Sequence, residues 1–167
     1  MNETHTLLHE FLCGATRVAV LGAGSVLRGD DAAGMVLFER LAEHFEGMDD
    51  VRCFPGETAP ENYSGSIRRF SPSHLIVADA ADFDHPAGQI FAIDPNDVGG
   101  LSCCTHMLPL KVMLNYLVQE TGTRLLLLGI QPQSMEFEEP LTDAVASAVD
   151  ELYNAIVSAV EEHLKTE

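Results

Sequence analysis

An apolar run, Arg17-Val-Ala-Val-Leu-Gly22, leads directly into a glycine-rich turn, Gly22-Ala-Gly-Ser-Val-Leu-Arg-Gly-Asp-Asp31. The run has the length and composition of a buried strand. After the turn, apolar residues recur at spacings of three and four, which predicts a helix from near Asp30 to near Gly47. A strand followed by a helix is the repeating unit of α/β proteins.

The same alternation continues along the chain of 167 residues, with no internal repeat and no low-complexity linker. We therefore expect one α/β domain spanning 1–167. The predicted strands are 17–22, 51–54, 74–79, 88–94 and 124–130, and the predicted helices are an N-terminal amphipathic stretch, 30–47, 60–70, 109–119 and 141–164. Between 79 and 88 there is no room for a crossover helix, so the fourth strand is predicted to run antiparallel. The first and third strands are predicted to be parallel neighbours.

The chain is strongly acidic, with nine Lys and Arg against 26 Asp and Glu and a formal charge of -17. Such a charge repels phosphate backbones and anionic lipid, which disfavours nucleic acid and membrane partners. No apolar run approaches the ~20 residues that span a bilayer. An acid stands at Glu3, where a secretory signal would carry basic residues. The sequence predicts a cytoplasmic protein.

Asp30 and Asp31 form the first candidate site, at the start of the predicted helix. Acids at this position commonly cap a helix and complement its dipole. Only one of two adjacent carboxylates can fold back onto the free amides, so we expect Asp30 to cap and Asp31 to face a cleft, with the reverse assignment open. The turn also resembles a dinucleotide fingerprint, but Leu27 replaces the third glycine, which disfavours a nucleotide-binding reductase.

Asp79 and His106 are the other candidates. Asp79 closes the third strand, although Asp82 competes with it and a loop-bracing role is the plain alternative. His106 directly precedes a predicted helix, whose positive end favours the neutral imidazole that binds metals. Two carboxylates and one imidazole suit Ni²⁺ or Zn²⁺.

The remaining histidines and the cysteines have weaker claims to a metal. His5, His44, His74 and His85 have no partner at ligand spacing, His9-Glu10 lacks the second histidine of a zinc-protease motif, and His163 lies on the surface-prone end of the last helix. Cys13, Cys53, Cys103 and Cys104 show no Cys-x-x-Cys spacing and are expected to be reduced thiols. At most one of the adjacent Cys103 and Cys104 can readily reach a metal.

Five blocks in the same order resemble the hydrogenase maturation endopeptidases, and most closely the branch acting on hydrogenase 3 of the formate hydrogenlyase type. The blocks are Gly29-Asp-Asp-Ala-Ala-Gly34, Thr58-Ala-Pro-Glu-Asn-Tyr63, Val77-Ala-Asp-Ala-Ala-Asp-Phe83, Thr105-His-Met-Leu-Pro-Leu110 and Leu128-Gly-Ile-Gln-Pro132. The likeness extends from Val18 to about Tyr153. One departure is Ser25, which stands where the family usually has asparagine.

The resemblance implies a three-layer α/β/α fold with a mostly parallel five-stranded sheet. It also implies an aspartic-type endopeptidase that removes the C-terminal extension from the nickel-loaded precursor of a [NiFe] hydrogenase large subunit. Its metal-coordinating residues would be Asp31, Asp79 and His106, with nickel presented by the substrate and Asp31 or Asp79 activating water. Alternatively the three residues only anchor the nickel, or the chain is a non-proteolytic nickel-binding chaperone or sensor.

Overall fold

The computed structural model describes residues 2–96 and 107–164, except the side chains of Met107 and Leu108. Five strands form one sheet in the order β2-β1-β3-β5-β4. Their bounds are Val18–Ala23 for β1, Val51–Glu57 for β2, His74–Ala80 for β3, Ile90–Ile93 for β4 and Arg124–Ile130 for β5. Four strands are parallel, and β4 pairs antiparallel with β5. The predicted mixed sheet, including the adjacent β1 and β3, is confirmed.

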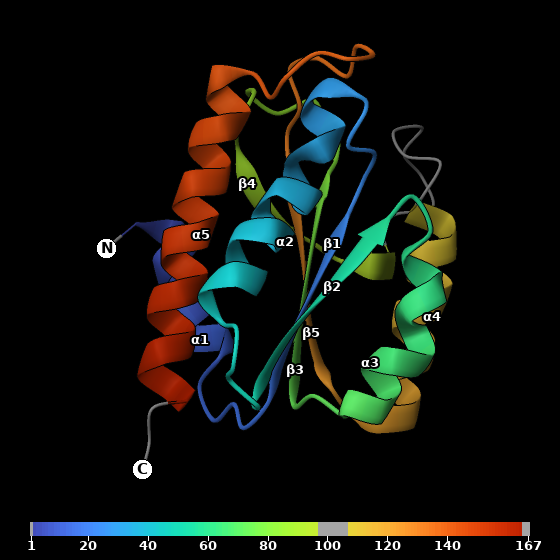
Figure 1. Ribbon diagram of the computed structural model, residues 1–167, viewed down its shortest axis with the longest axis vertical. Helices are drawn as coiled ribbons and strands as arrows, with labels where there is room; N and C mark the ends of the chain where they lie inside the picture. Colours follow the sequence, from blue (N-terminus) through green and yellow to red (C-terminus); the bar gives the residue numbers. More distant parts are fainter. Residues whose placement is uncertain (1, 97–106, 165–167) are drawn as a thin grey trace.

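Helices cover both faces of this sheet (Figure 1). One face carries α1 (Glu3–Phe11), α2 (Ala33–His44) and α5 (Asp143–Leu164), and the other carries α3 (Ser64–Phe70) and α4 (Met107–Thr121). Two short 3-10 helices, η1 (Gly29–Ala32) and η2 (Pro60–Tyr63), precede α2 and α3. The predicted helices are therefore present, and those expected at 30–47 and 60–70 each open with a 3-10 turn.

The alternating side chains of the central strands build two separate cores. In β1, Val18 and Val20 pack with α1, α2 and α5, whereas Ala19 and Leu21 pack with α3 and α4. Because neighbouring residues of a strand point to opposite faces, a run that is apolar at every position requires cover on both sides. This is why the uninterrupted apolar runs predict an internal parallel sheet.

Gly34 lets α2 lie directly against the ends of β1 and β3. A Cβ atom at this position would lie 2.4 Å from the main-chain oxygen of Ala23 and 2.4 Å from that of Ala78. Any side chain would push the helix away from the sheet. The approach fixes the start of α2, and with it η1, over the carboxyl ends of β1 and β3.

Two further expectations concern membranes and cysteines. Within the described ranges no helix has the length and hydropathy needed to cross a bilayer. Cys13 and Cys53 are free thiols, and burial raises the pKa of Cys53 to about 12. Cys103 and Cys104 lie outside the described residues.

Candidate active site

Asp79 is a buried carboxylate near the end of a central strand. Only 1% of the residue is exposed, and among the described residues Oδ1 has no hydrogen-bond partner. Burial and, secondarily, the charge of Asp31 raise the pKa of Asp79 well above its ordinary value, while the amide of Ala80 acts in the opposite direction. A buried carboxylate oxygen without a partner is costly. Asp79 therefore needs either a proton or a cation.

Asp31 reaches the same place from η1. The residue is 9% exposed, and its Oδ2 accepts a hydrogen bond of 2.9 Å from the amide of Ser25. Gly24 lies between the two acids, with φ +126°: a Cβ there would lie 1.9 Å from the main-chain oxygen of Asp31 and 3.4 Å from Asp79 Oδ1. The glycine turn therefore brings Asp31 and Asp79 together at one rim of the sheet. Ser25 also braces the turn through its hydroxyl, which accepts from the amide of Leu27 at 3.3 Å.

Asp30 has a different role from the one predicted. Its carboxylate does not cap η1 or α2. Instead Oδ2 accepts from the amides of Gln133 and Ser134 at 2.8 and 3.0 Å, and Oδ1 accepts from the amide of Thr142 at 2.7 Å. The Thr142 hydroxyl donates to it as well. The expectation that Asp30 caps its own helix is wrong, because partners more than 100 residues away offer more donors. Asp31 is still the acid that faces Asp79.

Hydrogen bonds hold the pKa of Asp30 below its ordinary value. Burial by itself would raise that pKa, but the amides of Ser134, Thr142 and Gln133 and the Thr142 hydroxyl together outweigh it. Asp30 is thus an ionised, fully satisfied structural carboxylate. It anchors the segment that leads from β5 into α5.

Asp82, the competitor of Asp79, lies on the exposed loop after β3. Its Oδ1 accepts from Gln131 Nε2 at 2.9 Å and from the amide of Asp84 at 3.1 Å, and these bonds lower the pKa of Asp82. Gln131 is buried and also accepts from the amides of Phe83 and His85. The sequence analysis did not predict that Gln131 holds this loop in place. Gln131 nevertheless lies in the last of the five blocks that resemble the hydrogenase maturation endopeptidases. Asp79, not Asp82, is the buried acid.

His106 lies outside the described residues, so its place beside Asp31 and Asp79 stays a prediction. Helix α4 begins at Met107, the next residue. Among the residues that the structure describes, the two aspartates come together without a third acid, histidine or cysteine at ligand distance.

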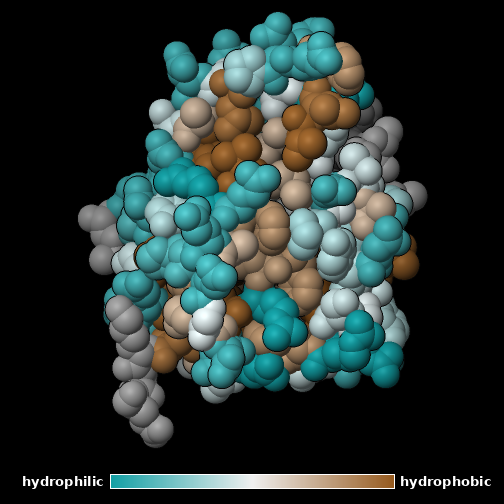
Figure 2. Space-filling model, in the orientation of Figure 1, coloured by the Kyte–Doolittle hydropathy of each residue, from teal (hydrophilic) through white to brown (hydrophobic). Residues whose placement is uncertain are grey.

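Exposed apolar side chains flank this rim, a feature the sequence analysis did not identify. Val26 and Leu27 are 55% and 56% exposed, and Phe137 is 64% exposed. Their two segments are joined by a β-bridge between Arg28 and Phe137 and by a 2.8 Å hydrogen bond from the amide of Glu138 to the oxygen of Leu27. Figure 2 shows hydrophobic surface in the upper part of the molecule, below a hydrophilic top edge. We call Val26, Leu27 and Phe137 the apolar rim.

These features define an α/β protein with paired aspartates at the carboxyl edge of its sheet. One of the two is buried, and its Oδ1 has no hydrogen-bond partner among the described residues. Residues 35–159 match the sequence profile of the family described as HycI, hydrogenase maturation protease. Asp79 and His106 fall within that range, and Asp31 lies just before it. The chain is 34% identical over 138 residues to the hydrogenase 3 maturation protease of Escherichia coli K12, covering 82% of this chain and 86% of the relative.

Two solved structures share the fold. The crystal structure of a [NiFe] hydrogenase maturation protease, HycI, from Thermococcus kodakarensis KOD1 superimposes with a TM-score of 0.82 at 32% identity, covering 96% of this chain and 99% of that one. The solution structure of the endopeptidase HycI from Escherichia coli gives a TM-score of 0.74 at 28% identity, covering 91% and 100%. The chain belongs to the hydrogenase maturation protease family.

Proposed function

We propose that this protein is an endopeptidase that removes the C-terminal extension from the nickel-loaded precursor of a [NiFe] hydrogenase large subunit. Membership of the maturation protease family supports the reaction class. The observation that carries the assignment of the site is the buried Oδ1 of Asp79, which has no partner among the described residues and lies beside Asp31.

Recognition of the substrate's nickel is assigned to Asp31, Asp79 and His106. Carboxylate oxygens and an imidazole nitrogen are suitable ligands for a borderline divalent ion. A cation at Asp79 Oδ1 would satisfy an oxygen that has no partner among the described residues, and it would favour the ionised form. The ion arrives with the precursor, so the site need not hold a metal of its own between reactions.

Cleavage requires water to add across the scissile amide. The hydroxyl joins the carbonyl carbon, one proton passes to a carboxylate, and that proton is then delivered to the departing amine. In the free protein, burial and the charge of Asp31 raise the pKa of Asp79, which favours its protonated form. A cation beside Oδ1 would favour loss of that proton to solvent, and the ionised carboxylate could then accept a proton from the attacking water. We assign water activation to this aspartate pair. Because the pair also recognises nickel, cleavage would depend on prior insertion of nickel into the precursor.

Incubation of the protein with the large-subunit precursor tests this function. With nickel-loaded precursor we expect a shift to a smaller product, and with nickel-free precursor we expect none. A nickel-binding chaperone or sensor would bind the loaded precursor without the size shift.

Asp31→Asn and Asp79→Asn variants, assayed separately for binding and for cleavage, assign the roles. Retained binding with lost cleavage supports water activation, whereas loss of both supports anchoring of nickel. Full cleavage by both variants would contradict the assignment of the site.

A further inference from the structure

The outer helices bring three potential metal ligands together at the end of the molecule opposite Asp31 and Asp79. His9 lies on α1, and Glu162 and His163 lie near the end of α5 (Figure 1). His9 Nδ1 is 3.0 Å from Glu162 Oε2, and the ring centroids of His9 and His163 are 5.8 Å apart. One ring nitrogen of each histidine and one Glu162 oxygen all lie within 4.8 Å of one another.

An ion pair between His9 and Glu162 does not account for the whole cluster. His163 Nε2 is buried and has no hydrogen-bond partner among the described residues. Leaving an imidazole nitrogen in this state costs free energy. A divalent cation would instead bind both rings and the carboxylate.

His9 is also oriented as a ligand would be. Its Nε2 is 3.2 Å from Ser158 Oγ, while its Nδ1 faces Glu162. Metal-binding histidines almost always use one ring nitrogen for the metal and the other for a hydrogen bond that fixes the ring. Ser158, one turn before Glu162 on α5, supplies such a partner.

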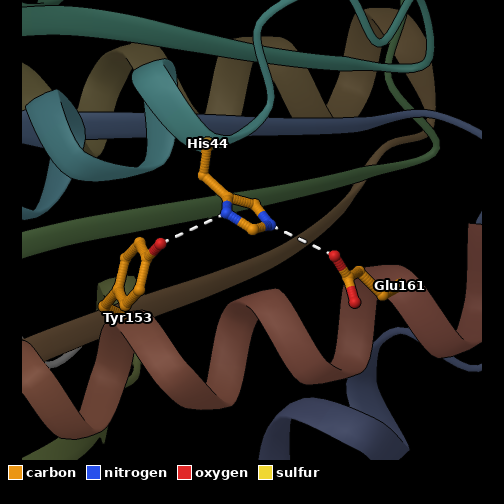
Figure 3. A network of polar contacts seen from close by, with 3 residues as sticks. All are labelled: His44, Tyr153 and Glu161. Carbon is orange, nitrogen blue, oxygen red and sulfur yellow. Dashed lines mark hydrogen bonds and ion pairs between the residues drawn. The ribbon is translucent and has the colours of Figure 1, made fainter.

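His44 shows what a histidine–glutamate pair looks like when no ligand is needed (Figure 3). Its Nε2 is 3.1 Å from Glu161 Oε1, and its Nδ1 is 3.2 Å from the Tyr153 hydroxyl. Both ring nitrogens therefore have partners within the protein. His44 ends α2, and both of its partners lie on α5, so this pair also joins an outer helix to α5 and provides a matched control.

We propose that His9, Glu162 and His163 form a second divalent metal site that clamps α1 to the end of α5. Two imidazoles and one carboxylate select Zn²⁺, Ni²⁺ or similar ions over Mg²⁺ and Ca²⁺, which prefer oxygen ligands. In a tetrahedral site with bonds of about 2.0–2.1 Å, the donor atoms lie about 3.3 Å apart, so small rotamer changes close the cluster. A hollow of about 590 Å³ lies beside the cluster and is lined in part by Thr16, Asp50, Glu162 and His163.

The site is independent of peptide cleavage, since it lies at the other end of the sheet. Its metal stabilises the folded state, because an ion that binds only the native protein raises its free energy of unfolding. The expected readouts are thus metal affinity and thermal unfolding, not protease activity.

Calorimetric titration of Zn²⁺ into chelator-treated, full-length protein tests the proposal. The Asp31→Asn/Asp79→Asn background removes the candidate active site, so the remaining binding can be assigned to the cluster. We expect one Zn²⁺ per chain and a rise in Tm with zinc. His9→Gln and His163→Gln should each weaken binding roughly tenfold or more and abolish the rise in Tm. His44→Gln should leave both unchanged.

Glu162→Gln offers a further test that alters neither imidazole ring, and the Glu162 side chain is 65% exposed. It should also weaken zinc binding if the three residues share one ion. The proposal is overturned if the Asp31→Asn/Asp79→Asn protein binds no zinc. It is also overturned if adding the His9, Glu162 or His163 substitution to that protein leaves its zinc affinity unchanged.

Discussion

Asp30 and Asp31 are adjacent, yet their carboxylates serve different parts of the molecule. Asp30 accepts from Gln133, Ser134 and Thr142 and anchors the segment before α5, whereas Asp31 accepts from the amide of Ser25 and lies near Asp79. One peptide unit thus connects a structural anchor to the candidate catalytic pair. Substitutions of the two acids should have separable effects.

Asp30→Asn should destabilise the fold by about 3 kcal/mol, because an amide cannot replace a carboxylate that receives only donors. Chemical denaturation measures the change, and hydrogen exchange should show loss of protection in 133–142. Asp31→Asn is the matched control, and it should cost less than about 1 kcal/mol because its amide oxygen can still accept from Ser25. Equal costs for the two variants would contradict the assigned roles.

The Asp30 anchor should also weaken in acid. Its pKa is lowered in the folded state, so its contribution is present above the ordinary value of 3.8 and is lost as pH falls through the folded pKa. The stability difference between the wild type and Asp30→Asn should therefore shrink below about pH 4. A difference that stays constant down to pH 2 would contradict the prediction.

Asp79→Asn should stabilise the metal-free protein while abolishing cleavage. The folded-state pKa of Asp79 is raised, so the folded protein binds its proton more tightly than the unfolded chain does. Wild-type stability is therefore lost as pH rises above 3.8 towards the folded pKa, and the variant avoids this loss. We expect a gain of about 1 kcal/mol or more near neutral pH. Denaturation at several pH values checks whether the gain grows with pH; a gain that does not depend on pH would exclude this cause.

Gly34→Ala should destabilise the protein by about 2 kcal/mol or more, because its Cβ would overlap two carbonyl oxygens that cannot easily move. Gly65→Ala in α3 is the control. There a Cβ would meet only the end of the Arg69 side chain, at 3.3 Å. Helix propensity predicts that this variant is stabilised by about 0.5–1 kcal/mol. Thermal unfolding distinguishes them, and a neutral Gly34→Ala would show that α2 does not need its close approach to the sheet.

The apolar rim should contribute to binding of the precursor. Leu27→Asp and Phe137→Asp should weaken precursor binding roughly tenfold without loss of stability, because exposed apolar side chains beside a site commonly contact a partner. Val118→Asp on α4, at a residue 38% exposed and away from the rim, is the control. Surface plasmon resonance with nickel-loaded precursor measures the affinities. Unchanged binding by both rim variants would exclude this surface.

Much of the architecture follows from local sequence. The apolar runs at β1, β3 and β5 are too continuous for a half-exposed strand, so they require a sheet covered on both faces. The short link after Asp79 requires an antiparallel β4. The proximity of Asp31 and Asp79 can be predicted in the same way, because polar residues at the carboxyl ends of neighbouring parallel strands meet at one edge of the sheet.

Tertiary structure alone decided which residues share a hydrogen bond or a cluster across long separations. The donors that hold Asp30 come from 103 to 112 positions further along the chain. His9 and His163 lie at opposite ends of the sequence, so their spacing matches no metal-binding motif. They meet only because α1 packs beside α5 on the sheet. Periodicity specifies which face of each element is buried, but the partner across that face depends on how the whole chain packs.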